Sequence, residues 1–361
     1  MKPAEEIEIK DYTCEAHTPA IAAIDLGTNS CRILIARVNI AALQMMYFRS
    51  RPRQESWRII DSMAKIVRLG EGIHDCDELS INAIDRALEA LEVCKQKIDL
   101  HNVRYVRAVA TEACRRATNT QILIDRARKE LNLDINIISP SEEARLAITG
   151  CAAVLNPKIP YALVFDIGGG STEIAWISVG GRSQPRRPGY PVPFSVIASI
   201  SLPCGVVTSS EQYGDKSFTI EACNEICDAV KEGLNGFFEC NDIDYYIQKG
   251  LVQLLGSSGT VTTVAAMALD LQRYERTAVD GASFLVSDLD QVTQKILNMT
   301  DAQRFEHPCI GGGRTELVVI GSAILRGIYD RTKLDTMRVA DRGVREGILV
   351  DLMSEVLRSN V

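Results

Sequence analysis

The chain has 361 residues, which corresponds to two domains at about 150 residues per domain. Apolar residues make up 46% and charged residues 24%, a composition that excludes a disordered, collagen-like or coiled-coil chain. The net charge of −7 argues against nucleic-acid binding and against adsorption to anionic membranes, because both need a basic surface. No stretch approaches the roughly 20 apolar residues of a membrane span, and the N-terminus lacks the pattern of a secretory signal, so we expect a cytoplasmic protein.

The sequence contains eleven cysteines, an odd number scattered along the chain without a CxxC motif. Only Cys223 and Cys227 lie close together, in an apparently helical run, and the four histidines are distant from them in sequence. This pattern favours buried, reduced thiols over a disulfide framework or a cysteine metal site.

Alternating apolar runs and turn residues predict α/β architecture in the first half of the chain. Residues 21–26 are expected to form a buried strand that ends in an acid, followed by a Gly-Thr-Asn-Ser turn and a returning strand over 32–39. From Leu79, apolar residues keep helical spacing for five turns, which predicts a long helix. The next expected elements are a strand at 103–110, a helix at about 119–131 and a strand at 135–139.

The opening unit is repeated in the second half. Asp25-Leu26-Gly27-Thr28-Asn29-Ser30 corresponds to Asp166-Ile167-Gly168-Gly169-Gly170-Ser171 at an offset of 141 residues, and apolar strands flank both turns. A repeat at roughly half the chain length predicts two related α/β domains that face each other. The elements expected after the second copy are a helix at 221–238, a strand, turn and helix over 251–270, and a last strand and helix over 337–357.

Three turns rich in glycine and hydroxyl residues are candidate phosphate-binding loops. Consecutive small residues let backbone N–H groups converge on an anion, and Ser and Thr hydroxyls add donors. The candidate residues are Gly27, Thr28, Asn29 and Ser30 in the first turn, Gly168, Gly169, Gly170 and Ser171 in the second, and Gly256, Ser257, Ser258 and Gly259 in the third. Each turn alone is also compatible with an ordinary hairpin or a strand-to-helix connection. Two copies in register on a repeat favour a two-sided phosphate clamp.

Asp25 and Asp166 end the strands that precede the first two turns. An aspartate at such a position can hold Mg²⁺ against bound phosphates, directly or through water. We therefore expect Mg²⁺ as the cofactor, with these two residues on the metal side of the site.

The segment Ser139-Pro140-Ser141-Glu142-Glu143 predicts the start of a helix. Ser139 as N-cap and Glu142 three residues later form a capping box, and Pro140 suits the first helical position. Glu143 is then available as a general base for water beside a phosphate site. The alternative is that Glu143 only complements the helix dipole, as acids in a first turn usually do.

An arginine-rich segment is locally unusual in this acidic protein. No Asp or Glu occurs between Ile174 and Ser210, whereas Arg182, Arg186 and Arg187 lie in a stretch rich in glycine and proline. The segment is either a solvated hairpin tip or a landing surface for a polyanion.

Six motifs, in order between residues 20 and 352, resemble the exopolyphosphatase/guanosine pentaphosphate phosphatase family, which shares a superfamily with sugar and acetate kinases, actin and the heat-shock chaperone ATPases. The motifs are IDLGTNSCRILI, ATEACRRATN, SEEARL, FDIGGGSTEI, GSSGTVTTVA and RVADRGVREGIL. The resemblance implies an α/β fold of two duplicated ribonuclease-H-like domains, as in actin-like ATPases, facing a central cleft. The first domain would comprise residues 1–146 and 341–361, and the second residues 147–340.

The resemblance also implies an enzyme that uses Mg²⁺ and water to release terminal orthophosphate from inorganic polyphosphate, or the 5′ γ-phosphate from guanosine pentaphosphate (pppGpp). By position, Glu143 matches the family's general base and Glu173 a second essential acid. Asp25 and Asp166 match the metal-side acids, and Arg115 matches an arginine that faces the phosphates. The residues that match the family's phosphate loops are Asn29, Ser30, Gly168, Gly169, Gly170 and Ser171.

Several functions remain open at this stage. Polyphosphate and pppGpp both present a terminal anhydride phosphate, and no guanine-binding motif is visible. An ATP-dependent kinase of the same superfamily is a second class, but Glu143 argues against it, because a bound hydroxyl acceptor needs no base for water. A third is a catalytically silent sensor of polyphosphate or alarmone. A homodimer is expected from the resemblance alone.

Overall fold

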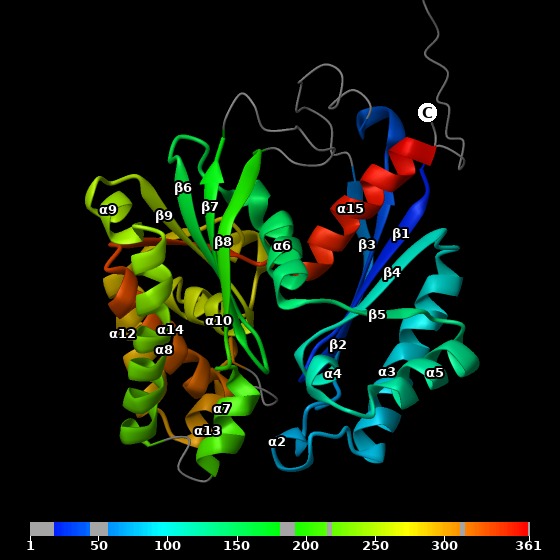
Figure 1. Ribbon diagram of the computed structural model, residues 1–361, viewed down its shortest axis with the longest axis horizontal. Coiled ribbons are helices and arrows are strands. Elements are labelled where there is room, and N and C mark those ends of the chain that lie inside the picture. Colours follow the sequence, from blue (N-terminus) through cyan, green and yellow to red (C-terminus); the bar gives the residue numbers. More distant parts are fainter. Residues whose placement is uncertain (1–17, 44–56, 181–191, 215–218, 311–314, 360–361) are drawn as a thin grey trace, which may run out of the picture.

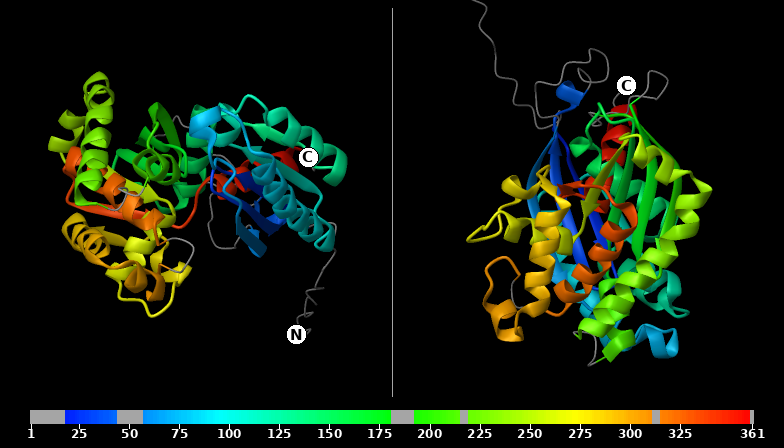
Figure 2. Two further views of the ribbon diagram at one scale, coloured as in Figure 1. Left: turned by 90° about the horizontal axis from the view of Figure 1, so that it is seen from below. Right: turned by 90° about the vertical axis from the view of Figure 1, so that its left-hand side faces the viewer.

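The computed structural model describes residues 18–43, 57–180, 192–214, 219–310 and 315–359. It consists of two halves, each built on one mixed sheet with helices packed against it (Figure 1). The halves also lie side by side when the molecule is seen from below (Figure 2). This arrangement confirms the expected α/β fold of two related domains.

The first half contains a five-stranded sheet in the order β3-β2-β1-β4-β5. Its strands are β1 (Ala20–Leu26), β2 (Ser30–Val38), β3 (Trp57–Ile66), β4 (Tyr105–Ala110) and β5 (Ile135–Ile137). Its helices are α2 (Ile73–Cys76), α3 (Ile81–Leu100), α4 (Glu112–Arg116) and α5 (Thr120–Leu131). β1 is antiparallel to β2 and parallel to β4, so the turn after β1 and the end of β4 meet at the same edge of the sheet.

The second half contains a six-stranded sheet in the order β10-β11-β9-β6-β7-β8. Its strands are β6 (Tyr161–Ile167), β7 (Thr172–Val179), β8 (Phe194–Leu202), β9 (Val252–Ser257), β10 (Ser283–Leu285) and β11 (Thr336–Ala340). Its helices are α7 (Val206–Tyr213), α8 (Ile220–Cys240), α9 (Ile243–Gln248), α10 (Gly259–Ala268), α11 (Arg276–Val279), α12 (Val286–Asn298), α13 (Asp301–Glu306) and α14 (Leu317–Thr332). Two further helices lie between the halves: α6 (Pro140–Cys151), which continues into a short 3₁₀ turn (Ala152–Val154), and α15 (Val344–Ser359).

The two sheets share the same opening unit. β1–β2 and β6–β7 are antiparallel hairpins, and β4 and β9 each add in parallel to the first strand of their hairpin. Asp25 pairs with Arg32 in the first hairpin, and Asp166 pairs with Glu173 in the second, so the registers match at the offset of the sequence repeat. The structure therefore confirms the predicted duplication.

Side chains alternate along the strands, and both faces of each sheet are covered. In the first sheet, Ile24 packs with residues of α3 and α5, whereas Ile21 packs with residues of α15. In the second sheet, Phe165 packs with residues of α8, α10 and α14, whereas Val164 packs with residues of α6. Strands buried on both faces lack polar alternation, which explains why β1 and β6 read as continuous apolar runs.

α6 and α15 cross between the two halves (Figure 1). A Cβ atom on Gly347 would lie 2.0 Å from a carbonyl oxygen of α6, and one on Gly150 would lie 2.1 Å from a carbonyl oxygen just before α15. Only glycine lets the two backbones approach this closely. Along α6, Ala147 belongs to the core of the first half and Ile148 to that of the second. The chain thus passes from one core to the other within α6. The expected domain bounds, 1–146 with 341–361 and 147–340, stay a prediction.

The other expected elements are present, with ends displaced by a few residues. β3 and β8 are not predicted from the sequence; both are edge strands with partly exposed side chains, so neither shows a clear apolar pattern. All ten cysteines in the described ranges are free, and seven are buried, whereas Cys76 and Cys240 are exposed. Among the described helices, none has the length and apolar content needed to cross a membrane.

Candidate active site

The turn between β1 and β2 is fixed by hydrogen bonds from a neighbouring segment. The N–H of Gly27 donates to the carbonyl of Ser30 at 3.0 Å, and the carbonyls of Thr28 and Asn29 accept from N–H groups of residues 67–70 at 2.9–3.0 Å. In a trans peptide the N–H points opposite to the carbonyl. The N–H groups of Asn29 and Ser30 therefore point away from residues 67–70 and are available to an anion.

The turn between β6 and β7 is built in the same way. The N–H of Gly168 donates to the carbonyl of Ser171 at 2.8 Å, and the carbonyls of Gly168 and Gly169 accept from the first N–H groups of α7 at 2.8–3.2 Å. By the same geometry, the N–H groups of Gly169 and Gly170 point away from α7. Both turns thus direct carbonyls outward and leave N–H groups for a ligand.

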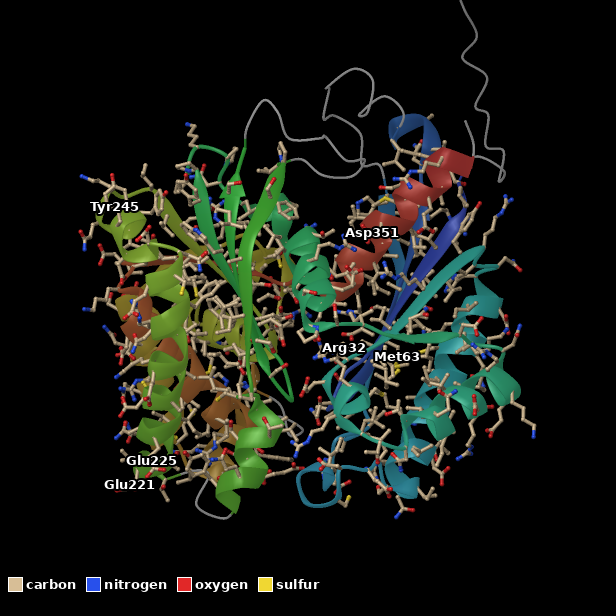
Figure 3. The ribbon with its side chains drawn as sticks, in the orientation of Figure 1. Arg32, Met63, Glu221, Glu225, Tyr245 and Asp351 are labelled. Atoms are coloured by element: carbon tan, nitrogen blue, oxygen red, sulfur yellow. The ribbon has the colours of Figure 1, made fainter. Side chains whose placement is uncertain are left out.

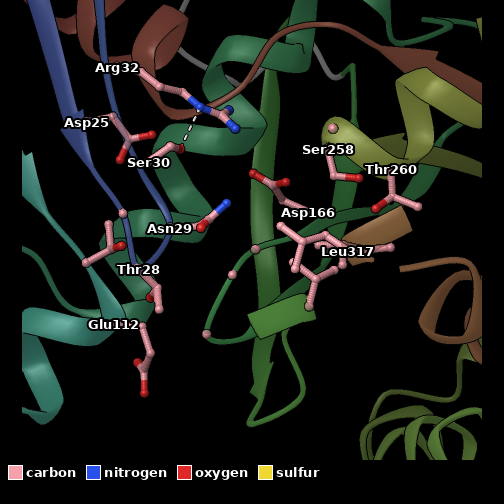
Figure 4. Close-up of a pocket in the computed structure, with 18 of the residues that line it drawn as sticks. Asp25, Thr28, Asn29, Ser30, Arg32, Glu112, Asp166, Ser258, Thr260 and Leu317 are labelled. Atoms are coloured by element: carbon pink, nitrogen blue, oxygen red, sulfur yellow. Dashed lines mark hydrogen bonds between the residues drawn. The ribbon is translucent and has the colours of Figure 1, made fainter. Parts of the chain in front are cut away.

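The two turns line one cleft of about 430 Å³, and Gly169 and Gly170 of the second turn lie directly against Thr28 of the first. Figure 4 shows Asp25 and Asn29 on one side of this cleft and Asp166 and Ser258 on the other. The predicted site residues that line it are Asp25, Gly27, Thr28, Asn29, Ser30, Glu143, Asp166, Gly168, Gly169, Gly170, Ser171, Ser258 and Gly259. The two copies of the repeat therefore meet at one cavity.

The third turn contributes only in part. Ser258 caps α10 by accepting a hydrogen bond from the N–H of Val261 at 3.0 Å, and it lines the cleft together with Gly259. Ser257 instead lines a smaller adjoining pocket, and its hydroxyl donates to a backbone carbonyl at 2.6 Å. Gly256 lies inside β9, where a Cβ atom would come within 2.5 Å of the Phe165 ring. Gly256 is thus a packing residue of the sheet and lies outside the cleft wall.

Two aspartates from opposite halves line the same cleft. Burial raises the pKa of Asp25, an effect that Arg32 and Arg345 partly offset. Burial, with the nearby charge of Glu173, raises the pKa of Asp166 to about 7. A cleft that keeps two poorly solvated carboxylates has an excess of negative charge and favours a cation among its ligands.

Glu143 lies in the first turn of α6 and lines the cleft, with 15% of its side chain exposed. Arg115 donates to its Oε2 at 2.7 Å. Burial and the charge of Glu173 raise the pKa of Glu143 to about 8, although Arg115 acts in the opposite direction. A carboxyl group with a pKa near neutrality, beside a phosphate site, is suited to accept a proton from water.

Glu173 is buried beneath the second turn and does not line the cleft wall. Its Oε1 accepts hydrogen bonds from the hydroxyls of Ser171 at 2.5 Å and Ser201 at 3.0 Å. Burial raises its pKa in spite of these bonds. Its position couples the second turn electrostatically to Glu143 and Asp166.

Only one of the two hydrogen bonds of the predicted capping box forms, so the prediction is wrong for Glu142. Ser139 does accept a hydrogen bond from the N–H of Glu142 at 3.2 Å, as an N-cap residue should. The Glu142 carboxylate, however, pairs with Arg145 at 2.7 Å and Arg107 at 2.9 Å, and both arginines also pair with Asp351. Hydrogen bonds from the two arginines lower the pKa of Glu142 to about 2. The two arginines give the Glu142 carboxylate three charge-assisted hydrogen bonds, two of them from the fork of Arg145, whereas the N–H of Ser139 could give one.

Arg115 contacts acids and is absent from the cleft wall. Its guanidinium donates to Glu143, to the carbonyl of Ile138 at 2.9 Å, and twice to Glu112 Oε2, at 2.8 and 3.1 Å. These partners orient Glu143, and the expected contact of Arg115 with phosphates stays a prediction.

Two basic residues that line the cleft are missing from the sequence predictions. Arg32 lines the cleft near the middle of the molecule, and its Nε donates to the Ser30 hydroxyl at 3.0 Å (Figures 3 and 4). Lys65 on β3 also lines the cleft and pairs with an exposed glutamate. The repeat contains a signal for Arg32, which occupies in the first copy the position of Glu173 in the second. No sequence signal marks Lys65.

Other predicted features are left without a structural test. Arg182, Arg186 and Arg187 lie outside the described residues. Across the described ranges, no three His, Cys, Asp or Glu side chains are grouped so that they could hold a metal ion. Asp25 and Asp166 would therefore bind a cation only together with other ligands, such as phosphate oxygens and water.

Comparison with known proteins places the chain in a family. Residues 50–356 match the Ppx/GppA phosphatase family. The chain belongs to this family. Over 351 residues it is 27% identical to the guanosine-5′-triphosphate,3′-diphosphate pyrophosphatase of Photobacterium profundum, covering 95% of this chain but 61% of that protein. It is also 27% identical to exopolyphosphatase 2 of Mycobacterium tuberculosis, covering 92% of this chain and 98% of that one.

Solved structures of Ppx/GppA proteins share the fold. A protein described as exopolyphosphatase-like superposes with a TM-score of 0.78 at 28% identity, covering 94% of this chain and 99% of that one. The PPX-GPPA enzyme of Aquifex aeolicus superposes with a TM-score of 0.69 at 26% identity, covering 92% and 99%. The two-domain architecture implied by the sequence motifs is thereby confirmed.

Proposed function

We propose that this Ppx/GppA protein hydrolyses terminal phosphoanhydride bonds and releases orthophosphate from inorganic polyphosphate. One observation carries the proposal: Glu143, a poorly solvated carboxyl group, lines the same cleft as two glycine-rich turns from opposite halves whose N–H groups are free of backbone partners. The turns offer N–H donors to a phosphate, and Glu143 offers a base for water. Hydrolysis of a bound phosphoanhydride needs this combination.

Residues of this chain account for binding and for proton transfer. The N–H groups of the two turns hold the oxygens of the terminal phosphate from both sides. Arg115 fixes Oε2 of Glu143, so the other carboxylate oxygen accepts a proton from water. The water oxygen forms a bond to the terminal phosphorus, and the bridging oxygen leaves with the shortened chain. Arg32, which also lines the cleft, adds positive charge beside the phosphates.

Mg²⁺ fits the chemistry of the cleft. Asp25 and Asp166 would hold it, because both line the cleft and burial raises the pKa of both carboxyl groups, which an added cation would reverse. Mg²⁺ commonly binds through one or two carboxylates plus substrate phosphates and water. When bound, it neutralises negative charge on the anhydride oxygens.

Polyphosphate is the leading substrate, because two cations, Arg32 and Lys65, line the cleft and suit a ligand that carries a chain of phosphates. Because pppGpp ends in the same kind of anhydride phosphate, it remains the second substrate to test.

The test is orthophosphate release from long polyphosphate, tripolyphosphate, pppGpp and ATP in parallel, with Mg²⁺ and with excess chelator. We expect Mg²⁺-dependent release with the highest kcat/KM on long polyphosphate. Higher kcat/KM on pppGpp would reassign the substrate, and release from none of the four would overturn the hydrolase. Phosphoryl transfer from ATP to an added alcohol, without release to water, would identify a kinase.

A further inference from the structure

Glu112 is an acid at the cleft that the proposed mechanism does not use. It is the first residue of α4, and Figure 4 shows it on the same side of the cleft as Asp25 and Thr28. It also lines a second cavity, of about 220 Å³, between α2, α4 and α7. Its carboxylate contacts Arg115, the residue that holds Glu143. Glu112 is therefore placed to act on the base through this arginine.

The guanidinium of Arg115 is shared between two acids. Its Nε and Nη2 donate to Oε2 of Glu112 at 3.1 and 2.8 Å. Its Nη1 donates to Oε2 of Glu143 at 2.7 Å and to the carbonyl of Ile138 at 2.9 Å. Glu112 thus takes the whole edge of the guanidinium formed by Nε and Nη2. Holding this edge fixes the rotation of the guanidinium, so that Nη1 is the nitrogen that reaches Glu143.

Glu143 consequently receives one hydrogen bond from Arg115 instead of two. In the described part of the chain, the hydrogen bond from Arg115 goes to Oε2, and no protein group donates to Oε1. An arginine beside a carboxylate frequently forms two parallel hydrogen bonds, one to each oxygen. Two such bonds would occupy both oxygens of the base and leave none to accept a proton from water.

The second half of the molecule holds Glu112 in this position. A Cβ atom on Gly170 would lie 2.7 Å from Cγ and 3.1 Å from Cβ of Glu112, so the stem of this side chain packs directly on the second turn. α4 has only five residues, and its N-cap residue Thr111 makes no side-chain capping bond. Because so short a helix is marginal by itself, the contact with Gly170 helps to fix the carboxylate beside Arg115.

We propose that Glu112 is a positioning residue: it occupies one edge of the Arg115 guanidinium and thereby keeps Oε1 of Glu143 free to accept the proton of the attacking water. This inference rests on the proposed hydrolysis of phosphoanhydrides. When Glu112 releases the guanidinium, a rotation of Arg115 brings a second N–H to Glu143.

The first test is the kinetics of orthophosphate release from polyphosphate by Glu112→Gln. The amide keeps the stem packed on Gly170, but it is neutral and accepts hydrogen bonds from a cation more weakly than a carboxylate does. We expect kcat to fall roughly tenfold with KM within about twofold of wild type, because the base is blocked while the phosphate turns are unchanged. Glu130→Gln is the matched control and should keep both constants, since Glu130 also accepts from an arginine, Arg126 at 2.8 Å, but on the surface of α5.

The loss should also depend on Glu143. In the Glu143→Gln background the base is already absent, so adding Glu112→Gln should change kcat by less than about twofold. A further loss of about tenfold in that background would overturn the proposal, because Glu112 would then act independently of Glu143. Unchanged kcat in the single variant, or a change confined to KM, would overturn it as well.

Crystal structures of wild type and Glu112→Gln give a readout that needs no substrate. In the variant we expect two nitrogens of Arg115 to donate to the two oxygens of Glu143. An Arg115 that still donates to one oxygen only would overturn the inference. If wild type releases no orthophosphate from any phosphoanhydride, the proposed function is overturned, and these structures still decide whether Glu112 sets the geometry of Arg115 and Glu143.

Discussion

Asp25, Glu143, Asp166 and Glu173 are four acids gathered at or beneath one cleft. Burial is the main cause of the raised pKa of each, and for all four a neighbouring acid adds to it. Gathering acids in this way costs folding free energy, but it creates groups that change charge near neutral pH. The ionisation of a single residue, Glu143, therefore has consequences for both rate and stability.

The pH dependence of turnover reports on Glu143. Its pKa is raised to about 8, and only the ionised form can accept a proton from water. We therefore expect kcat/KM for polyphosphate, which reports on the free enzyme, to rise with pH as Glu143 ionises and then to level off. A kcat/KM that does not change between about pH 6 and pH 8 would contradict the assignment of Glu143 as the base.

Glu143→Gln should make the protein more stable at high pH. Folding raises the pKa of Glu143, so between pH 4.5 and about 8 the folded protein keeps a proton that the unfolded chain has lost. The contribution of Glu143 to stability therefore falls as the pH rises through this range. Glutamine has no such ionisation, so the variant should melt roughly 2–5 °C above wild type at pH 8 and close to wild type at pH 4.5. Calorimetry at both pH values measures the difference. A difference in melting temperature that is the same at both pH values would assign the effect to packing.

At the residue scale, the sequence predicts which side chains gather at the site better than it predicts what they touch. Asp25, Asp166 and Glu143 are found because each stands at a strand end or a helix start that local patterns reveal. The partners of Glu142 could not be found in this way. Arg107 lies 35 residues before it, and Asp351 lies 206 residues after Arg145, so only the folded sheet brings them together.

At the element scale, the network of Arg107, Glu142, Arg145 and Asp351 fixes the first turn of α6. Its ion pairs span 2.5–3.2 Å and join β4, α6 and α15. Asp351 is visible on α15 in Figure 3. Because Glu143 follows Glu142 directly, this network determines where the base lies relative to the cleft.

Asp351→Asn should therefore lower kcat roughly tenfold with little change in KM, since a small displacement of a catalytic group is costly while the phosphate turns stay intact. Asp85→Asn is the matched control: Arg126 bridges Asp85 and Glu130 on the surface of α3 and α5, much as Arg145 bridges Glu142 and Asp351. Steady-state kinetics of both variants decide the matter. Equal losses in the two variants, or a loss confined to KM, would show that the network does not position Glu143.

The crossing of α6 and α15 should not tolerate a side chain. Gly347→Ala places a methyl group where a backbone carbonyl oxygen already stands 2.0 Å away, so the helices must move apart. We expect a loss of roughly 1–3 kcal/mol in the free energy of unfolding. Gly236→Ala on α8 is the control, because a Cβ atom there meets nothing within 4 Å. Urea denaturation of the two variants gives the comparison. Equal denaturation midpoints would show that the crossing of α6 and α15 does not require glycine at this position.

At the scale of the whole molecule, the duplication is the feature that the sequence predicts best. Two copies of one strand-turn-strand unit, related by a constant offset, fix the hairpins, their register and the meeting of both turns at one cleft. The edge strands β3 and β8 escape prediction because partly exposed strands lack a distinct pattern. The cavity between α2, α4 and α7 escapes it as well, since its walls come from both halves and exist only once these have packed together.

The proposed metal dependence belongs to the assembled cleft. Because Asp25 and Asp166 come from different halves, Mg²⁺ bound between them and the phosphates would link the two halves. Asp166→Asn should raise the Mg²⁺ concentration for half-maximal activity roughly tenfold, measured by titrating Mg²⁺ at fixed polyphosphate. Activity in excess chelator equal to that with Mg²⁺ would show that the metal assignment is wrong.

The most direct test is the rate of orthophosphate release by Glu143→Gln under saturating polyphosphate, compared with wild type and with Glu130→Gln. Glu130 is an exposed acid on α5 and serves as the matched control. The amide keeps the shape of Glu143 but cannot take a proton from water, so we expect a loss of about 10²- to 10⁴-fold, with polyphosphate binding retained and Glu130→Gln unaffected. Retention of more than about a tenth of wild-type turnover by Glu143→Gln would contradict the assignment of Glu143 as the base of a hydrolase.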